Sequence, residues 1–149
     1  MGLRRQAREL ALQTLFQHDI LKEHPAQETV VPEAKRVPVE AEVPAEAILF
    51  VDQLVQGVLA KAPELDALLK QFAEHWSVER MAVVDRNVLR CALYELLYLD
   101  DIPAKVTINE AIEIAKRYGS EESGAFVNGI LDRIVKSDER LLTKRLATA

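Results

Sequence analysis

Apolar side chains recur along most of the chain at the three- and four-residue spacing of amphipathic helices. One such stripe covers about residues 3–21, and a second begins after Pro44. Another stripe starts at Pro63, and proline suits the first position of a helix because its missing N–H is not needed there. The pattern therefore predicts three successive helices by about residue 74.

Residues 88–99 differ from these stripes because they are apolar almost all round. A helix of this kind belongs in the interior, where other helices wrap it. Asp85 is placed to cap its N-terminus, since a carboxylate there accepts a backbone N–H and meets the positive end of the helix dipole. A short helical turn is expected just before it, over about residues 78–83.

Two further helical runs follow the central one. Residues 106–117 form an amphipathic run in which Glu113 and Arg117 are spaced to pair on the outer face. The apolar phrase 126–132 comes next, and no stretch alternates as a strand would. We expect an all-α fold of about seven helices, in two small packed helical subdomains around a central apolar helix.

The length of the chain, 149 residues, fits a single domain. The N-terminal helices should span about residues 3–74 and the C-terminal helices about 78–136. Residues 23–44 carry prolines and glutamates without a sustained period, which predicts a flexible insertion. The last residues, from about 137 to 149, are expected to form a mobile tail.

The composition and motifs of the chain argue against several classes of protein. The net charge is -5, and the lone Cys91 excludes an internal disulfide framework and a multi-cysteine zinc site. Cys91 lies in the most apolar helix and is expected to be a buried, inert thiol. The sequence has no glycine-rich phosphate loop, metal-ligand spacing or nucleophile motif, so we expect neither an enzyme nor a cofactor. It also has no membrane-length apolar run and no signal peptide, which predicts a cytoplasmic protein.

A cluster of arginines near the N-terminus suggests a binding site. Arg4, Arg5 and Arg8 stand at helical spacing before the first acidic residue, at a helix end where the dipole disfavours cations. A chain that tolerates this cost can use the guanidinium groups to hold phosphates. The alternative is a solvated basic N-terminus. Phe16, two turns further on, is either a stacking platform for an unpaired base or a core residue.

Two other positions invite a partner. Glu121, Glu122 and Ser123 occupy the first turn of a helix at a corner, where they are accessible to another molecule. Gly129 interrupts a strong helix at a cost of about 1 kcal/mol relative to alanine. We therefore expect another helix or the backbone of a ligand to approach Gly129 closely.

Several separated phrases of the chain together resemble the NusB family of bacterial transcription antitermination factors. They are residues 4–16, 85–97, 104–113 and 126–132, in the same order and spacing. The resemblance covers nearly the whole chain outside 23–44 and the tail. It implies two packed helical subdomains and binding of single-stranded boxA leader RNA together with the ribosomal protein NusE. It also implies action with the other Nus factors on elongating RNA polymerase.

The resemblance also assigns roles to residues. The arginine-rich motif falls on Arg4, Arg5 and Arg8, and its aromatic residue on Phe16. The corner region that the family uses for RNA and partner contacts falls on Glu122, Ser123 and Phe126, and positions near the partner interface fall on Asp85 and Arg86. Gln6 stands where many members have a basic residue, which weakens the phosphate site. On this basis Arg8→Ala should weaken RNA binding without lowering thermal stability.

Two other functions remain open at this point. One is a protein–protein helical adaptor that makes no RNA contact, with the arginines merely solvated. The other is the NusB-like domain of ribosomal RNA cytosine methyltransferases, which we set aside because the chain ends at Ala149 without a glycine-rich cofactor site. A homodimer that covers the arginine face is also possible.

Overall fold

The computed structural model describes residues 2–23, 44–73 and 77–147, and the side chains of these as far as Lys144. The described part is helical and contains no strand, so the all-α prediction is confirmed. The expected insertion lies outside the described residues, apart from its two ends. The elements are α1 (Leu3–Glu23), α2 (Ala45–Phe72), the 3₁₀ turn η2 (Val78–Arg80), α3 (Val83–Tyr98), α4 (Ala104–Tyr118), α5 (Ser123–Ser137), the 3₁₀ turn η3 (Glu139–Leu141) and α6 (Leu142–Ala147).

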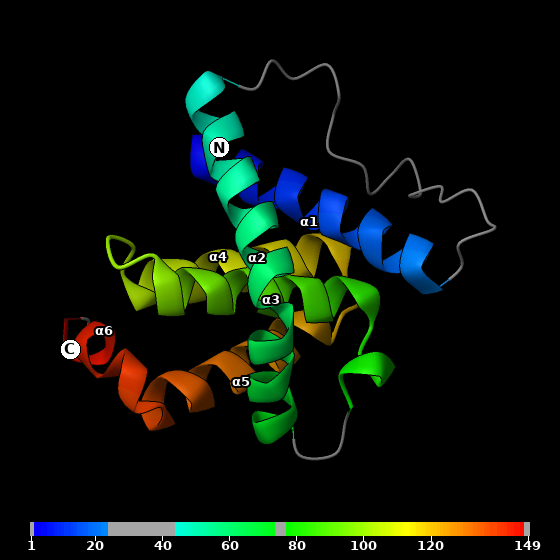
Figure 1. Cartoon of the computed structure of the whole chain (residues 1–149). Coiled ribbons are helices and arrows are strands. Elements are labelled where there is room, and N and C mark those ends of the chain that lie inside the picture. Colours follow the sequence, from blue (N-terminus) through cyan, green and yellow to red (C-terminus); the bar gives the residue numbers. More distant parts are fainter. Residues whose placement is uncertain (1, 24–43, 74–76, 148–149) are drawn as a thin grey trace.

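The central helix is α3, as expected. The pair α1 and α2 packs on one side of it and the pair α4 and α5 on another, so α3 contacts all four (Figure 1). Its apolar side chains, among them Leu89, Leu93 and Leu96, are almost wholly buried. Their burial joins both helix pairs into one hydrophobic core. No helix within the described ranges is long and apolar enough to cross a membrane.

The prediction that Pro63 begins a new helix is wrong. One continuous helix, α2, runs through it from Ala45 to Phe72. Pro63 cannot donate to the carbonyl of Leu59 four residues earlier, which usually disfavours proline inside a helix. Both residues lie on the exposed side of α2, where water can satisfy that carbonyl.

Two expected helix ends also differ from the structure. Ala82 is the N-cap of α3, and Asp85 lies within the first turn of the helix without capping it. Within the expected tail of about residues 137–149, the described part as far as Ala147 is ordered into η3, which Asp138 caps, and α6. Leu141 is buried, and Lys144 Nζ donates to the carbonyls of Glu95 (2.8 Å) and Leu99 (2.7 Å) at the C-terminal end of α3. A lysine that satisfies these carbonyls holds α6 against the core.

Candidate RNA and partner surfaces

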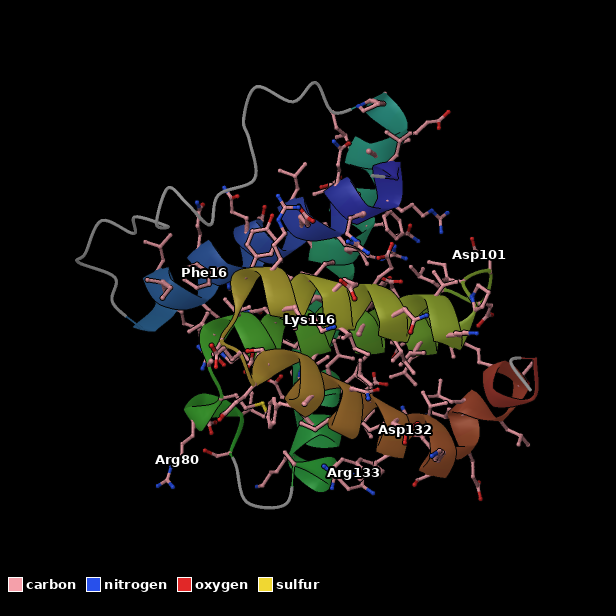
Figure 2. The ribbon with its side chains drawn as sticks, turned by 180° about the vertical axis from the view of Figure 1, so that it is seen from behind. Phe16, Arg80, Asp101, Lys116, Asp132 and Arg133 are labelled. Carbon is pink, nitrogen blue, oxygen red and sulfur yellow. The ribbon has the colours of Figure 1, made fainter. Side chains whose placement is uncertain are left out.

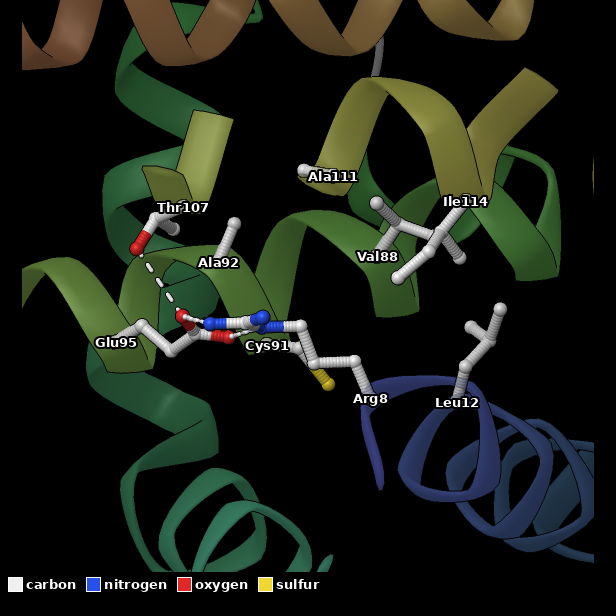
Figure 3. Close-up of a pocket in the computed structure, with 9 residues that line it drawn as sticks. All are labelled: Arg8, Leu12, Val88, Cys91, Ala92, Glu95, Thr107, Ala111 and Ile114. Carbon is white, nitrogen blue, oxygen red and sulfur yellow. Dashed lines mark hydrogen bonds and ion pairs between the residues drawn. The ribbon is translucent and has the colours of Figure 1, made fainter. Parts of the chain in front are cut away.

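Arg8 does not lie on an exposed basic face. Its guanidinium donates from Nε and Nη2 to the two carboxylate oxygens of Glu95, each at 2.8 Å (Figure 3). The exposed fractions of the two side chains are only 5% and 2%, and Thr107 Oγ1 donates to the same carboxylate at 3.0 Å. Arg8 therefore joins α1 to α3 inside the protein, which contradicts the expected stability-neutral Arg8→Ala. Sequence spacing alone could not reveal a partner 87 residues away.

The other two arginines of the predicted cluster are more accessible. Arg5 forms an ion pair with Glu110 of α4, and about a quarter of its side chain is exposed. Arg4 is 54% exposed; it lies 3.7 Å from Asp101 and over the ring of Phe50, 4.7 Å from its centroid. The cluster is thus graded from buried Arg8 to accessible Arg4.

Phe16 lies on the same helix and is partly exposed (Figure 2). Among the described side chains, it belongs neither to the buried core nor to the partly buried group that packs against that core. The ring can therefore meet an unpaired base by stacking, one of the two alternatives left open by the sequence.

The corner between α4 and α5 faces the start of α3. A pocket of about 350 Å³ lies between them, and three of the predicted residues, Asp85, Glu122 and Phe126, line it. Asp85 is only 8% exposed, and its Oδ1 is buried without a hydrogen-bond partner among the described residues. A buried carboxylate oxygen that lacks a donor is costly, so this pocket is suited to a ligand that brings one.

Two predicted contact residues serve the fold instead. Ser123 is 1% exposed, and its Oγ accepts the backbone N–H of Ser120 at 2.9 Å, which closes the α4–α5 corner. Arg86 is 4% exposed and donates from Nε to Asp19 Oδ2 at 2.9 Å. Both side chains are almost wholly buried and hydrogen-bonded within the chain.

Asp19 is the centre of a second, partly buried charge network. Besides Arg86, its Oδ2 accepts from Asn87 (2.9 Å) and Arg90 (2.8 Å), and Arg90 also binds Asp66 of α2. Burial by itself would raise the pKa of Asp19, but the hydrogen bond from Asn87 and the charges of Arg90 and Arg86 outweigh burial and lower it. This network ties α1 and α2 to the polar side of α3.

Cys91 is buried as expected, and burial raises the pKa of its thiol to about 12. At neutral pH it is therefore a protonated core residue, because the thiolate needed for reactivity is disfavoured.

Comparison with known proteins identifies the family. A sequence profile of the NusB family matches residues 5–136 of the chain. The transcription antitermination protein NusB of Desulfitobacterium hafniense is 51% identical over 134 residues, which cover 90% of this chain and 88% of that protein. The chain belongs to the NusB family. The NusB protein of Geobacter sulfurreducens is 48% identical over 138 residues, covering 92% of this chain and 96% of the relative.

Solved structures of NusB proteins agree with this assignment. T. maritima NusB is 40% identical, covers 99% of both chains and superposes with a TM-score of 0.78. A complex of antitermination factors NusB and NusE with dsRNA contains a chain that is 23% identical and gives a TM-score of 0.66, covering 92% of this chain and 98% of that one. At this identity the second structure supports the fold of the NusB family and nothing more specific.

Sequence reasoning missed four residues that line the corner pocket: Arg80, Met81, Ala82 and Ser120. Arg80 and Met81 stand at the end of η2, and Ser120 in the α4–α5 turn, so they meet only in the folded chain. No local pattern connects them. The signal available was the resemblance, which had already marked both sides of the pocket.

Proposed function

We propose that this chain binds single-stranded boxA-type leader RNA together with the small-subunit ribosomal protein NusE, and so keeps RNA polymerase elongating through ribosomal RNA operons. Membership of a family of antitermination proteins supports this function. The structural observation that carries it is Asp85 in the corner pocket, whose buried Oδ1 has no hydrogen-bond partner within the described ranges. Such a group fits a protein whose complete state includes a partner.

The RNA surface should lie on α1. Arg4 and Arg5 are exposed enough to reach phosphates, and Phe16 offers a ring to a splayed base. Arg8 contributes indirectly, since its ion pair with Glu95 fixes the part of α1 that carries them. With few cations engaged, RNA binding by the chain alone should be modest.

The partner surface should include the corner pocket. A lysine or arginine of NusE that enters the pocket would pair with the carboxylate of Asp85, and such a charge-assisted hydrogen bond is strong in a partly buried place. Glu122 at the rim would add attraction for a basic partner. A partner that adds its own RNA contacts raises the affinity of the complex for RNA through linkage.

The wider assembly is also part of the proposal. The complex would act in the cytoplasm with the other Nus factors and elongating RNA polymerase.

A homodimer that covers the arginine-bearing side of α1 would compete with RNA, so RNA should lower the dimer fraction in sedimentation experiments. A sedimentation coefficient that stays monomeric at every concentration would contradict the homodimer.

Fluorescence anisotropy with a short boxA-like RNA, a scrambled control and added NusE tests the function across a salt series. We expect tighter binding of boxA-like RNA when NusE is present. The log–log salt slope should be about -1.4 or steeper, from about -0.7 for each of two arginine contacts. Equal, weak binding of both RNAs in every condition would contradict the proposal.

The second candidate is the protein–protein adaptor. It is favoured by one observation: carboxylates of the protein itself already pair with Arg5 and Arg8. The adaptor predicts that NusE binds and that RNA affinity does not change with salt, so the same titration separates the two functions.

A further inference from the structure

Arg117 of α4 lies beside the predicted RNA residues of α1, although neither the sequence pattern nor the family motif marks it for RNA. Its Nη1 lies 3.2 Å from Oε1 and 3.5 Å from Oε2 of Glu9, a residue of α1. The sequence predicted a pairing of Arg117 with Glu113 within α4; in the structure Arg117 pairs with Glu9, and Lys116 Nζ lies 3.7 Å from Glu113. Arg117 bridges the two helices.

The bridge is held rigidly on its inner side. Glu9 is only 3% exposed and accepts a 2.7 Å hydrogen bond from the hydroxyl of Tyr118. Burial and the hydrogen bond to Glu9 raise the pKa of Tyr118 to about 12, so it remains a donor at neutral pH. Arg117 in turn lies over the Tyr118 ring, 5.4 Å from the centroid. A guanidinium fixed in this way loses little entropy when it binds an anion.

The outer side of Arg117 is accessible. Its side chain is 46% exposed, compared with 24% for Arg5 and 5% for Arg8. The planar guanidinium group suits phosphate, which it can contact through two parallel hydrogen bonds. Of these three arginines, Arg117 therefore presents its charge to solvent most fully.

The position of Glu9 on α1 places Arg117 between two predicted RNA residues. Arg5 and Glu9 are four residues apart, and Glu9 and Phe16 are seven apart, so all three lie on one side of the helix. With a rise of about 1.5 Å per residue, Glu9 is about 6 Å from Arg5 and about 10 Å from Phe16 along the axis. Gln6, one turn before Glu9, adds no charge to this side.

We propose that Arg117 is an additional RNA-binding residue, which contacts the phosphate backbone of a single strand between the nucleotides held at Arg5 and Phe16. This inference rests on the proposed function. It identifies a cation on α4 that compensates for Gln6 on α1. The RNA-binding surface is thus built by two helices, and not by the N-terminal motif alone.

The test compares Arg117→Gln with Arg140→Gln in the anisotropy titration with boxA-like RNA and NusE. Glutamine removes the charge of Arg117 but can still donate to Glu9. We expect RNA affinity to fall about fivefold at 0.1 M salt and the salt slope to become shallower by about 0.7, the values for one lost phosphate contact. Arg140 is a matched control, because it is 50% exposed and is also paired with carboxylates, but those belong to Asp138 and Glu64. Arg140→Gln should leave the slope unchanged.

The outcomes separate the two proposals. A wild-type protein that binds RNA with salt dependence, together with an Arg117→Gln slope equal to that of wild type, would overturn the role of Arg117 alone. Equal losses in both variants would also overturn it, because they would reflect net charge. A wild-type protein without salt-dependent RNA binding would overturn the proposed function itself. Circular dichroism would show whether Arg117→Gln is folded.

A measurement on the wild-type chain covers the case in which the variant does not fold. In a ¹⁵N spectrum, the Nε–H signal of Arg117, assigned by its loss in Arg117→Lys, should shift when the RNA is added. An unchanged signal at saturating RNA would overturn the proposal.

Discussion

Two buried carboxylates on the same helix, Glu95 and Asp85 of α3, have opposite surroundings. Glu95 is 2% exposed, and its side chain accepts hydrogen bonds from Arg8 and Thr107. Asp85 is 8% exposed, yet one of its oxygens has no partner among the described residues. A buried carboxylate whose hydrogen bonds are complete inside the chain ties helices together and is costly to break by removal of one partner. A buried carboxylate oxygen without a donor points to a place for another molecule.

The largest expected effect on stability comes from breaking the ion pair between Arg8 and Glu95. Arg8→Ala leaves Glu95 buried without its cation, and removal of one member of a buried pair costs about 3–5 kcal/mol. Urea unfolding monitored by circular dichroism should show this loss in the free energy of unfolding.

A double variant controls for the size of the cavity. Arg8→Met combined with Glu95→Leu removes both charges and should recover most of the lost stability, because an apolar pair of similar volume often replaces a buried ion pair without cost. If Arg8→Ala unfolds like wild type and only its RNA binding is lost, Arg8 is an RNA contact after all.

Asp85→Ala tests whether the carboxylate of Asp85, which lacks one hydrogen bond, binds a partner. We expect a loss of at least about 2 kcal/mol in NusE binding, the usual cost of truncating one member of a buried charge pair at an interface. The free energy of unfolding should change by less than about 1 kcal/mol, because the lost interaction with the helix dipole is offset by removal of an unsatisfied buried oxygen. Calorimetric titration with NusE and urea unfolding measure the two quantities. Unchanged NusE affinity would remove the corner pocket from the partner surface.

The hydrogen-bonded network around Asp19 predicts how the free energy of unfolding depends on pH. The pKa of Asp19 is lowered in the folded protein, so its stabilising contribution is present above the unfolded value of about 3.9 and is lost as the pH falls through the lower, folded value. Asp19→Asn should therefore be less stable than wild type at neutral pH. The difference between the two should shrink as urea unfolding is measured from pH 5 down to pH 2.5. A difference that stays constant with pH would mean that Asp19 does not titrate with folding.

A substitution at Gly129 is expected to have the smallest effect on stability, and it tests an uncharged position for contact with a partner. The close neighbour expected from the sequence is not supplied by the described part of this chain, because a methyl group at Gly129 would meet nothing within 4 Å. Gly129→Ala should therefore raise the free energy of unfolding by about 1 kcal/mol. If it also weakens NusE or RNA binding, a partner covers this part of α5. Unchanged binding would show that this face is bare in the complex.

Local patterns predicted the helices well. Apolar spacing located α1 and the central α3, because a helix must bury one face whatever surrounds it. Pro63 was misinterpreted because the rule for proline at helix starts ignores whether the orphaned carbonyl can reach water. The C-terminal helix was missed because Lys144 is polar in sequence and becomes a buried cap only against the carbonyls of α3.

The candidate site was less predictable, since its chemistry depends on pairs far apart in the chain. The sequence treats Arg4 and Arg8 alike, and only folding brings Glu95 to Arg8 and leaves Arg4 accessible. Ser123 was expected to be exposed at the α4–α5 corner. In the structure its hydroxyl accepts the backbone N–H of Ser120 and closes that corner. The resemblance did mark Asp85, Glu122 and Phe126, which lie far apart in sequence and line one pocket.

The most direct test of the account is arginine footprinting with a dicarbonyl reagent, read by mass spectrometry with and without boxA-like RNA and NusE. We predict rapid modification of Arg4, which is 54% exposed, and its protection by the complex. Arg8, which is 5% exposed, should stay unmodified in both states. Modification of Arg8 in the native protein, followed by protection on RNA binding, would contradict the division between arginines that hold the fold and arginines that meet RNA.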